Sequence, residues 1–208
     1  GTLDIAGSFD LAGGAFTGSG SLTMSGGSLN LPAGNSVAWT NTGALTNTGT
    51  LNLAAATITN AIDNQGTINA GNGLVFTQTF TNNGMLVLGA GTTTFNNGLV
   101  QNAGTTQMNN GTVNGIVTIN AGTMMGGGNV NGSLTVNSVT LAVGFSLGTL
   151  NIAGSLVLGG ASTTAIELGG TGGGQFDLIN VGGNAALDGA LVVTYWGGFS
   201  GGGTFPVM

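Results

Sequence analysis

The sequence predicts an all-β fold, a parallel β-solenoid of about ten rungs with roughly 20 residues each. Three observations carry this prediction. Short Gly-x-apolar-x-apolar units recur along almost the whole chain, apolar and polar residues alternate within each unit, and 44 glycines leave almost no window for a helix. Alternation with a period of two is typical of strands that bury one face.

The repeating units share a glycine followed by two apolar residues with one polar residue between them. They lie at 1–5, 7–11, 20–24, 27–31, 49–53, 66–70, 115–119, 132–136, 148–152 and 154–158. In the middle of the chain, glycines recur every few residues, at Gly84, Gly91, Gly98, Gly104 and Gly111. Three such steps make a turn of about 20 residues, which falls in the range that indicates a solenoid.

Glycine and asparagine are expected at the corners between strands, because a corner needs positive φ angles that both residues tolerate. Asn-Gly recurs at 83–84, 97–98, 110–111, 114–115 and 131–132. The same dipeptide favours two-residue hairpins, so an antiparallel meander is the structural alternative. Corners are as frequent as strands here, which favours the solenoid. Stacked Asn residues would then exchange hydrogen bonds between rungs.

The charge pattern excludes several classes of function. The chain has no Lys, Arg, His or Cys, and its six acids give a net charge of −6. Nucleic-acid binding and attraction to anionic lipid both need basic residues, so neither is expected. Disulfides are excluded, and no apolar run is long enough for a transmembrane segment.

The inventory of catalytic groups is nearly empty. Ser and Thr are abundant, but without His or Lys no usual base can activate them. We therefore expect no enzyme activity, no catalytic or metal-binding residue and no cofactor. The glycine-rich segment 169–174 lacks the Gly-Lys-Ser/Thr of a phosphate loop and is interpreted as a flexible turn.

The carboxylates are the remaining candidates for chemistry: Asp4, Asp10, Asp63, Glu167, Asp177 and Asp188. Asp4 and Asp10 lie in successive units and could stack on one face, as the acids of polysaccharide-cleaving β-helices would. We interpret them instead as exposed strand positions. The last three acids show no Asp-x-Asp clustering, so a Ca²⁺ site is not predicted.

Two further patterns concern the surface and the C-terminal end. Thr-x-Thr segments recur at irregular intervals, so we interpret them as strand surface rather than an ice-binding array. Aromatic residues gather late in the chain, at Phe176, Tyr195, Trp196, Phe199 and Phe205. We expect them to plug the last rung, since the end of a solenoid must cover its core. A sugar-binding platform is the alternative.

Three segments in the C-terminal third resemble a known family. They are Ile-Glu-Leu-Gly at 166–169, Phe-Asp-Leu-Ile-Asn-Val at 176–181 and Leu-Asp-Gly-Ala-Leu at 187–191. Together they resemble the end of the β-helical passenger region of bacterial autotransporters and related large surface adhesins. The resemblance implies a right-handed parallel β-helix that is exported and displayed outside the cell. The absence of basic residues departs from the family's usual pattern.

This resemblance divides the chain into a repetitive solenoid body at 1–147 and autotransporter-like terminal rungs with a cap at 148–208, continuous with the body. The chain opens in mid-pattern at Gly1-Thr2-Leu3 with no polar cap. We therefore expect an open strand edge there, and we expect the chain to be a mature or excised piece of a longer product.

The expected function is that of an extracellular structural protein at the bacterial cell surface. Weak charge gives little repulsion between copies. Head-to-tail contacts that do not close on themselves generate filaments. The chain would then be a self-associating subunit of a surface fibre, sheath or biofilm matrix. The alternative is a cell-surface adhesin passenger domain that binds glycans or host surfaces.

Overall fold

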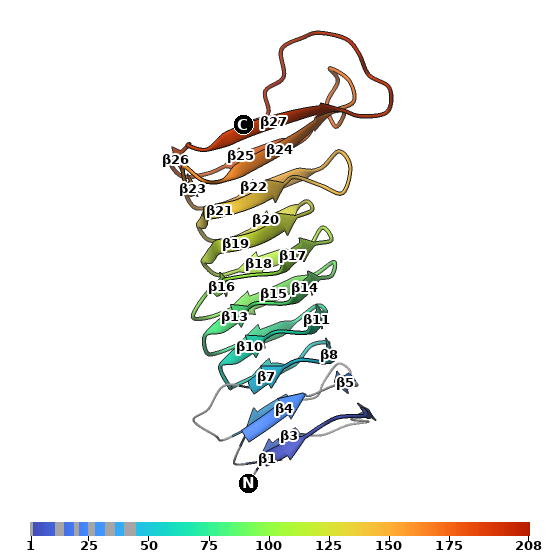
Figure 1. The fold of residues 1–208 in the computed structure, drawn as a ribbon, viewed down its shortest axis with the longest axis vertical. Helices are drawn as coiled ribbons and strands as arrows, with labels where there is room; N and C mark the ends of the chain where they lie inside the picture. Colours follow the sequence, from blue (N-terminus) through green and yellow to red (C-terminus); the bar gives the residue numbers. More distant parts are fainter. Residues whose placement is uncertain (1, 11–14, 19–20, 25–27, 32–35, 40–44) are drawn as a thin grey trace.

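The computed structural model describes the backbone of residues 2–10, 15–18, 21–24, 28–31, 36–39 and 45–208, and the side chains of residues 4–8, 29 and 45–208. The chain winds into a tall stack of short strands, with its two ends at opposite ends of the stack (Figure 1). These residues form 27 strands and no helix. Accordingly, none of them belongs to a helix that could span a bilayer.

The strands stack in three columns, one on each side of the solenoid. The first column contains β1 (Thr2–Asp4), β4 (Ser21–Met24), β7 (Leu45–Asn47), β10 (Ile62–Asn64), β13 (Phe80–Asn82), β16 (Leu99–Gln101), the first halves of β19 (Val117–Met125) and β21 (Leu134–Ala142), β23 (Leu156–Leu158) and β26 (Ala185–Ala186). The second contains β2 (Ser8–Asp10), β5 (Ser28–Leu31), β8 (Thr50–Leu53), β11 (Thr67–Ala70), β14 (Met85–Leu88), β17 (Thr105–Met108), the second halves of β19 and β21, β24 (Thr163–Leu168) and β27 (Ala190–Tyr195). The third contains β3 (Ala15–Gly18), β6 (Ser36–Trp39), β9 (Thr57–Ile58), β12 (Leu74–Phe76), β15 (Thr92–Phe95), β18 (Thr112–Asn114), β20 (Gly128–Val130), β22 (Thr149–Ile152) and β25 (Leu178–Val181).

The predicted parallel β-solenoid is confirmed. Every strand pairing in the described residues is parallel, for example between β11 and β14 or between β22 and β25. The antiparallel meander is therefore wrong for these residues. An isolated bridge between Leu168 and Phe176, outside the strand pairings, is antiparallel. In the described residues the first two columns hold ten strands each and the third holds nine, so the number of complete turns differs slightly from the expected ten or so.

The core is a narrow apolar interior that runs along the stack. Strands such as β8 and β11 alternate half-buried and buried residues, as the sequence pattern predicts. Three fully buried phenylalanines, Phe76, Phe80 and Phe95, pack together in the middle, with ring centroids 4.6–5.1 Å apart. Burying a side chain of this size stabilises a fold by about 1.5–3 kcal/mol.

One corner of the solenoid is built from stacked glycines. A Cβ atom added at Gly84, Gly104 or Gly122 would collide with the backbone carbonyl of the stacked glycine one turn below. Gly104 and Gly122 also have positive φ angles, of 71° and 90°. Only glycine fits both the spacing and the conformation, and this explains the regular glycines in the middle of the sequence.

A ladder of buried amides lies beside this corner. Asn47 donates to Asn64 Oδ1 at 2.8 Å, Asn64 donates to Asn82 Oδ1 at 2.8 Å, and Asn82 donates to Gln101 Oε1 at 3.2 Å. Each amide donates a second hydrogen bond to a backbone carbonyl of a neighbouring turn, as from Asn64 to Met85. We call these four residues the inner amide ladder.

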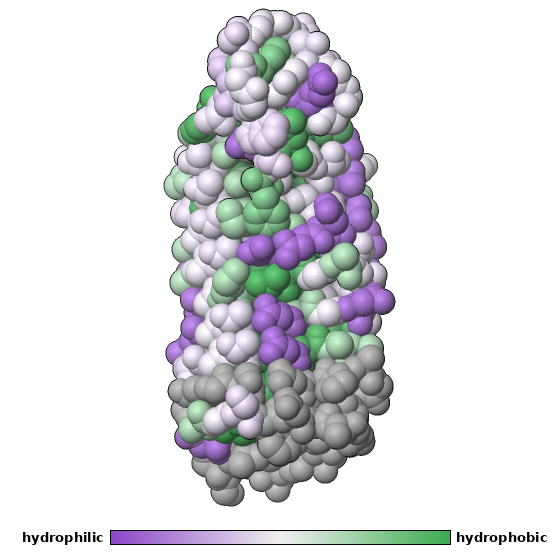
Figure 2. Space-filling model, turned by 90° about the vertical axis from the view of Figure 1, so that its right-hand side faces the viewer, coloured by the Kyte–Doolittle hydropathy of each residue, from purple (hydrophilic) through white to green (hydrophobic). Residues whose placement is uncertain are grey.

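Outer asparagine ladders confirm that stacked Asn residues bond between rungs. In one, Asn120 donates to Asn102 Oδ1 and Asn137 donates to Asn120 Oδ1, both at 2.8 Å. Another joins Asn129, Asn151 and Asn180. On the side drawn in Figure 2, hydrophilic and hydrophobic residues are interspersed among residues of near-neutral hydropathy.

Candidate interaction site at the C-terminal end

The last turn of the solenoid is not covered by another turn. Among the described strands, β26 pairs only with β23 and β27 pairs only with β24, so each has a free edge. In the register of β24 and β27, Leu191 and Val193 continue the rows of Thr164 and Ile166, which are buried inside the solenoid. Leu191 is nevertheless 60% exposed. The inward positions of the last turn therefore present an apolar surface at the end of the stack.

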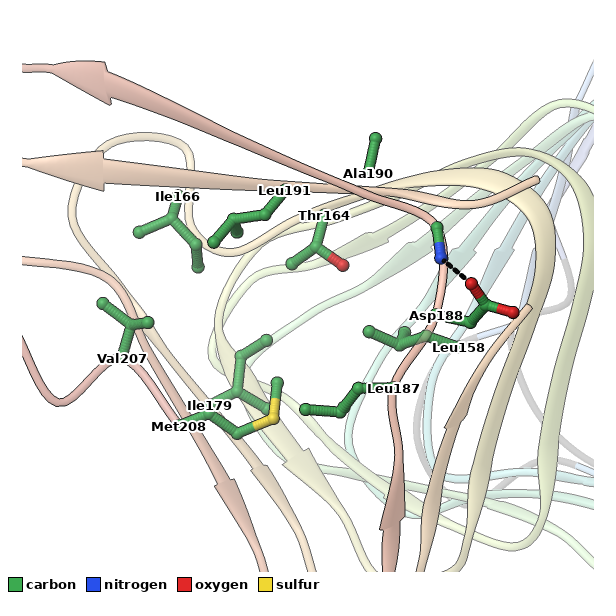
Figure 3. A pocket seen from close by; sticks show the side chains of 11 residues that line it. Leu158, Thr164, Ile166, Ile179, Leu187, Asp188, Ala190, Leu191, Val207 and Met208 are labelled. Carbon is green, nitrogen blue, oxygen red and sulfur yellow. Dashed lines mark hydrogen bonds between the residues drawn. The ribbon is translucent and has the colours of Figure 1, made fainter. Parts of the chain in front are cut away.

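This surface surrounds an apolar cavity of about 280 Å³, which we call the end cavity (Figure 3). Leu158, Ile166 and Ile179 line it from the turn below, and Leu187 and Leu191 line it from the last turn. The C-terminal tail borders the cavity with Val207 and Met208. The carbonyl of Val207 accepts a hydrogen bond from the backbone N–H of Ile179 at 2.9 Å, which holds the tail against β25.

The polar groups of the end cavity are few. Thr164 is buried, and its hydroxyl has no hydrogen-bond partner in the described part of the chain. A buried hydroxyl without a partner costs about 1–3 kcal/mol. The carboxylate of Asp188 lies at the edge of the cavity and accepts a hydrogen bond from the Gly189 backbone N–H at 2.8 Å (Figure 3). The lining of the end cavity is thus as apolar as the core, and the cavity is large enough to accept further apolar side chains.

Asp177 is a buried carboxylate that ties two separate segments together. It is 1% exposed, and its two oxygens accept hydrogen bonds of 2.7 Å from the backbone N–H groups of Gly148 and Glu167. Burial raises the pKa of Asp177 from 3.8 to about 6, although these hydrogen bonds act in the opposite direction. The sequence offers no basic side chain to pair with it.

Four of the five late aromatic residues, all but Trp196, are linked by ring contacts at this end. Phe176 is buried, and Phe199 and Phe205 pack against the core. Ring centroids lie 5.8 Å apart between Phe176 and Phe205, and 6.0 Å apart between Phe199 and Phe205. These three residues pack against the core, whereas Tyr195 and Trp196 are about half exposed or more. The expected plug over the last rung therefore forms only in part, because Leu187 and Leu191 of the last turn stay exposed.

The remaining acids do not assemble into a site. Asp4 and Asp10 lie in different columns, on β1 and β2, so the structure does not stack them on one face. Asp4 is exposed, and the side chain of Asp10 lies outside the described set. Both oxygens of Asp63 accept hydrogen bonds from amides, those of Gln65 and Asn83. Across the described residues, no three acids lie together as metal ligands would.

Two features of this structure were not predicted from the sequence. The inner amide ladder places polar residues at inward positions that the alternation assigns to apolar ones. A signal was present, because Leu-Thr-Asn, Ile-Asp-Asn, Phe-Thr-Asn and Leu-Val-Gln recur at 45–47, 62–64, 80–82 and 99–101. No recurring sequence pattern of this kind marks the residues that line the end cavity.

Comparisons with protein-family models, with curated proteins and with solved structures gave no match. What the structure shows of that resemblance is its coarser part, a solenoid of parallel strands.

Proposed function

We propose that this protein is an extracellular structural protein whose solenoids associate head to tail in a surface fibre, sheath or biofilm matrix. The observation that carries the proposal is the last turn, where β26 and β27 have free edges and Leu187 and Leu191 are 59% and 60% exposed. Free strand edges beside exposed apolar residues are templates for pairing with another chain.

The body of the solenoid supports a structural role. Its interior combines stacked apolar rows with the inner amide ladder, and its outer ladders fix the register of neighbouring turns. The likeness to autotransporter passengers supports export to the bacterial surface. We infer no catalytic role, since the chain has no Lys, Arg or His to assist one of its hydroxyl groups.

Electron microscopy and sedimentation velocity of the purified chain test the proposal. We expect filaments with an axial repeat that is a multiple of about 4.8 Å, the spacing of hydrogen-bonded strands. Leu191→Asp should abolish the filaments, because it would bury an unpaired charge in the contact between two stacked solenoids. Val157→Asp is the matched control, since Val157 is 40% exposed on β23, outside the lining of the end cavity. Single dispersed rods at all concentrations would contradict the proposal.

An adhesin that binds glycans is the second candidate. A groove of about 410 Å³ on the third column is lined by Asn129, Asn131, Asn151 and Asn180 together with apolar residues such as Ile152 and Val181. The four amides also bond within the outer ladders. Amide groups donate and accept hydrogen bonds, as sugar hydroxyls require. A glycan array probed with the chain tests this candidate, and Asn151→Ala should then weaken any binding. The absence of any bound glycan would count against it.

A further inference from the structure

We infer that Asn97 is a site of spontaneous modification, which the folded solenoid converts to isoaspartate and aspartate faster than the asparagines of its five other Asn-Gly sequences. In an Asn-Gly sequence, the backbone nitrogen of the glycine can attack the side-chain carbonyl carbon of the asparagine. Glycine favours this step, because it has no side chain to shield its nitrogen and its backbone is free to rotate. The modification does not depend on the proposed self-association.

The reaction needs only water as a co-reactant. The bond from Gly98 N to Asn97 Cγ forms, the bond from Cγ to Nδ2 breaks, and the side-chain nitrogen leaves as ammonia with the proton of the Gly98 N–H. Water then opens the cyclic imide, giving isoaspartate by attack at the main-chain carbonyl carbon and aspartate by attack at the side-chain one. Either product replaces a neutral amide by a carboxylate, so the chain gains one negative charge at pH 7.

The structure leaves the side chain of Asn97 free for this attack. Asn97 is exposed at the corner between β15 and β16, and its amide bonds to none of the residues that the structure describes. The N–H of Gly98 donates to the carbonyl of Phe95 at 3.1 Å, which closes a β-turn with Asn97 as its third residue. This bond is at the long end of the usual range, so the attacking nitrogen is only weakly held.

Three of the other asparagines are held by side-chain hydrogen bonds. Asn83 donates to Asp63 Oδ1 at 2.8 Å. Asn131 donates to Asn114 Oδ1 at 2.8 Å, and Asn114 donates to Thr94 Oγ1 at 3.4 Å. These bonds must break before the side chain can turn toward the following glycine. Each bond should therefore slow the reaction by about two- to tenfold, from the net strength of a hydrogen bond.

Asn72, which precedes Gly73, is exposed but held at both reacting groups. Its Oδ1 accepts a hydrogen bond from the N–H of Thr92 at 2.9 Å. The N–H of Gly73 donates to the carbonyl of Thr92 at 2.8 Å. A single residue of the next turn thus holds apart the carbonyl that would be attacked and the nitrogen that would attack it.

Asn110 is also exposed, but the backbone around it is fixed. Its N–H donates to the carbonyl of Gly127 at 3.0 Å, and the N–H of Thr112 donates to the carbonyl of Gly91 at 2.6 Å. Gly111, which carries the attacking nitrogen, is buried and lies against the backbone of the turn below. This nitrogen cannot rotate toward the Asn110 side chain without displacing that turn.

Peptide mapping of the purified chain tests the inference. The chain is incubated at mildly alkaline pH, which favours loss of the proton from the attacking nitrogen. It is then digested in acid with pepsin, which needs no Lys or Arg and stops the reaction. Mass spectrometry with electron-transfer fragmentation locates aspartate and isoaspartate. We expect Asn97 to convert about tenfold faster than Asn114, and faster than Asn72, Asn83, Asn110 and Asn131.

Two controls separate the structure from the sequence. In urea that unfolds the chain, all six asparagines should convert at similar rates, because their hydrogen bonds and corners are lost. Asn131→Ala leaves Asn114 Oδ1 without its donor and should accelerate conversion of Asn114 about two- to tenfold, with no change at Asn97. Faster conversion of any other asparagine in the folded chain, or a preference for Asn97 that persists in urea, would overturn the inference.

Discussion

Replacing Asn64 by Ala tests whether the inner amide ladder stabilises the solenoid. Asn64 is fully buried, accepts one hydrogen bond from Asn47 and donates two, to Asn82 Oδ1 and to the carbonyl of Met85. The substitution leaves Asn82 Oδ1 and one N–H of Asn47 buried without a partner. Since each such group costs about 1–3 kcal/mol, we expect the free energy of unfolding to fall by about 3–5 kcal/mol.

Equilibrium unfolding in urea, followed by circular dichroism and extrapolated to water, measures this loss. Hydrogen exchange across residues 45–108 shows whether the destabilisation is local, as nearest-neighbour stacking in a solenoid predicts. Asn120→Ala is the control, because Asn120 makes the same two ladder bonds at the surface, where water can replace them. The reasoning fails if both variants lose the same stability, or if Asn64→Ala loses less than about 1 kcal/mol.

Three further predictions concern single positions. Because the folded pKa of Asp177, about 6, lies above its ordinary 3.8, its contribution to stability is complete below pH about 4 and is lost as the pH rises through 6. Urea unfolding at pH about 3 and about 8 should differ by about 3 kcal/mol on this account, and Asp177→Asn should remove the difference. Gly104→Ala should cost about 3 kcal/mol or more, because its Cβ would collide with the carbonyl of Gly84. Gly173→Ala, with nothing within 4 Å of the added Cβ, should change the melting temperature little. Phe80→Ala should destabilise the fold by about 3–5 kcal/mol in the same urea assay, since it empties the centre of the phenylalanine cluster.

The fold could be predicted from the sequence because the strand pattern is local. Thr50–Leu53 and Thr67–Ala70 each carry the alternation that places two residues inward, and the glycines mark the corners. Parallel stacking was predicted from units that recur with about 20 residues per turn, the range that indicates a solenoid. Stacking also accounts for the outer Asn ladders, which were expected from the composition.

The interior polar residues could not be predicted from alternation alone. A buried Asn is unfavourable unless a partner lies one turn away, and the partner of Asn64 is 18 residues further along the chain, at Asn82. The end cavity is lined by residues that lie far apart in the sequence, from Leu158 to Met208, and no local residue pattern encodes that they meet. The separation of Asp4 and Asp10 depends on the corner between β1 and β2, which turns the second acid onto another side of the solenoid.

The length of a turn varies without disturbing the columns. Asn47 and Asn64 are 17 residues apart and Asn151 and Asn180 are 29 residues apart, yet each pair forms a hydrogen bond of 2.8 Å between its side-chain amides. The additional residues of the longer turn leave the stack as loops, one of which includes the exposed glycines Gly172–Gly174. Corner length and strand register are therefore independent. A foreign peptide inserted at this loop would be displayed at a fixed height on a rigid rod, which makes the fold a natural scaffold for spaced arrays of epitopes.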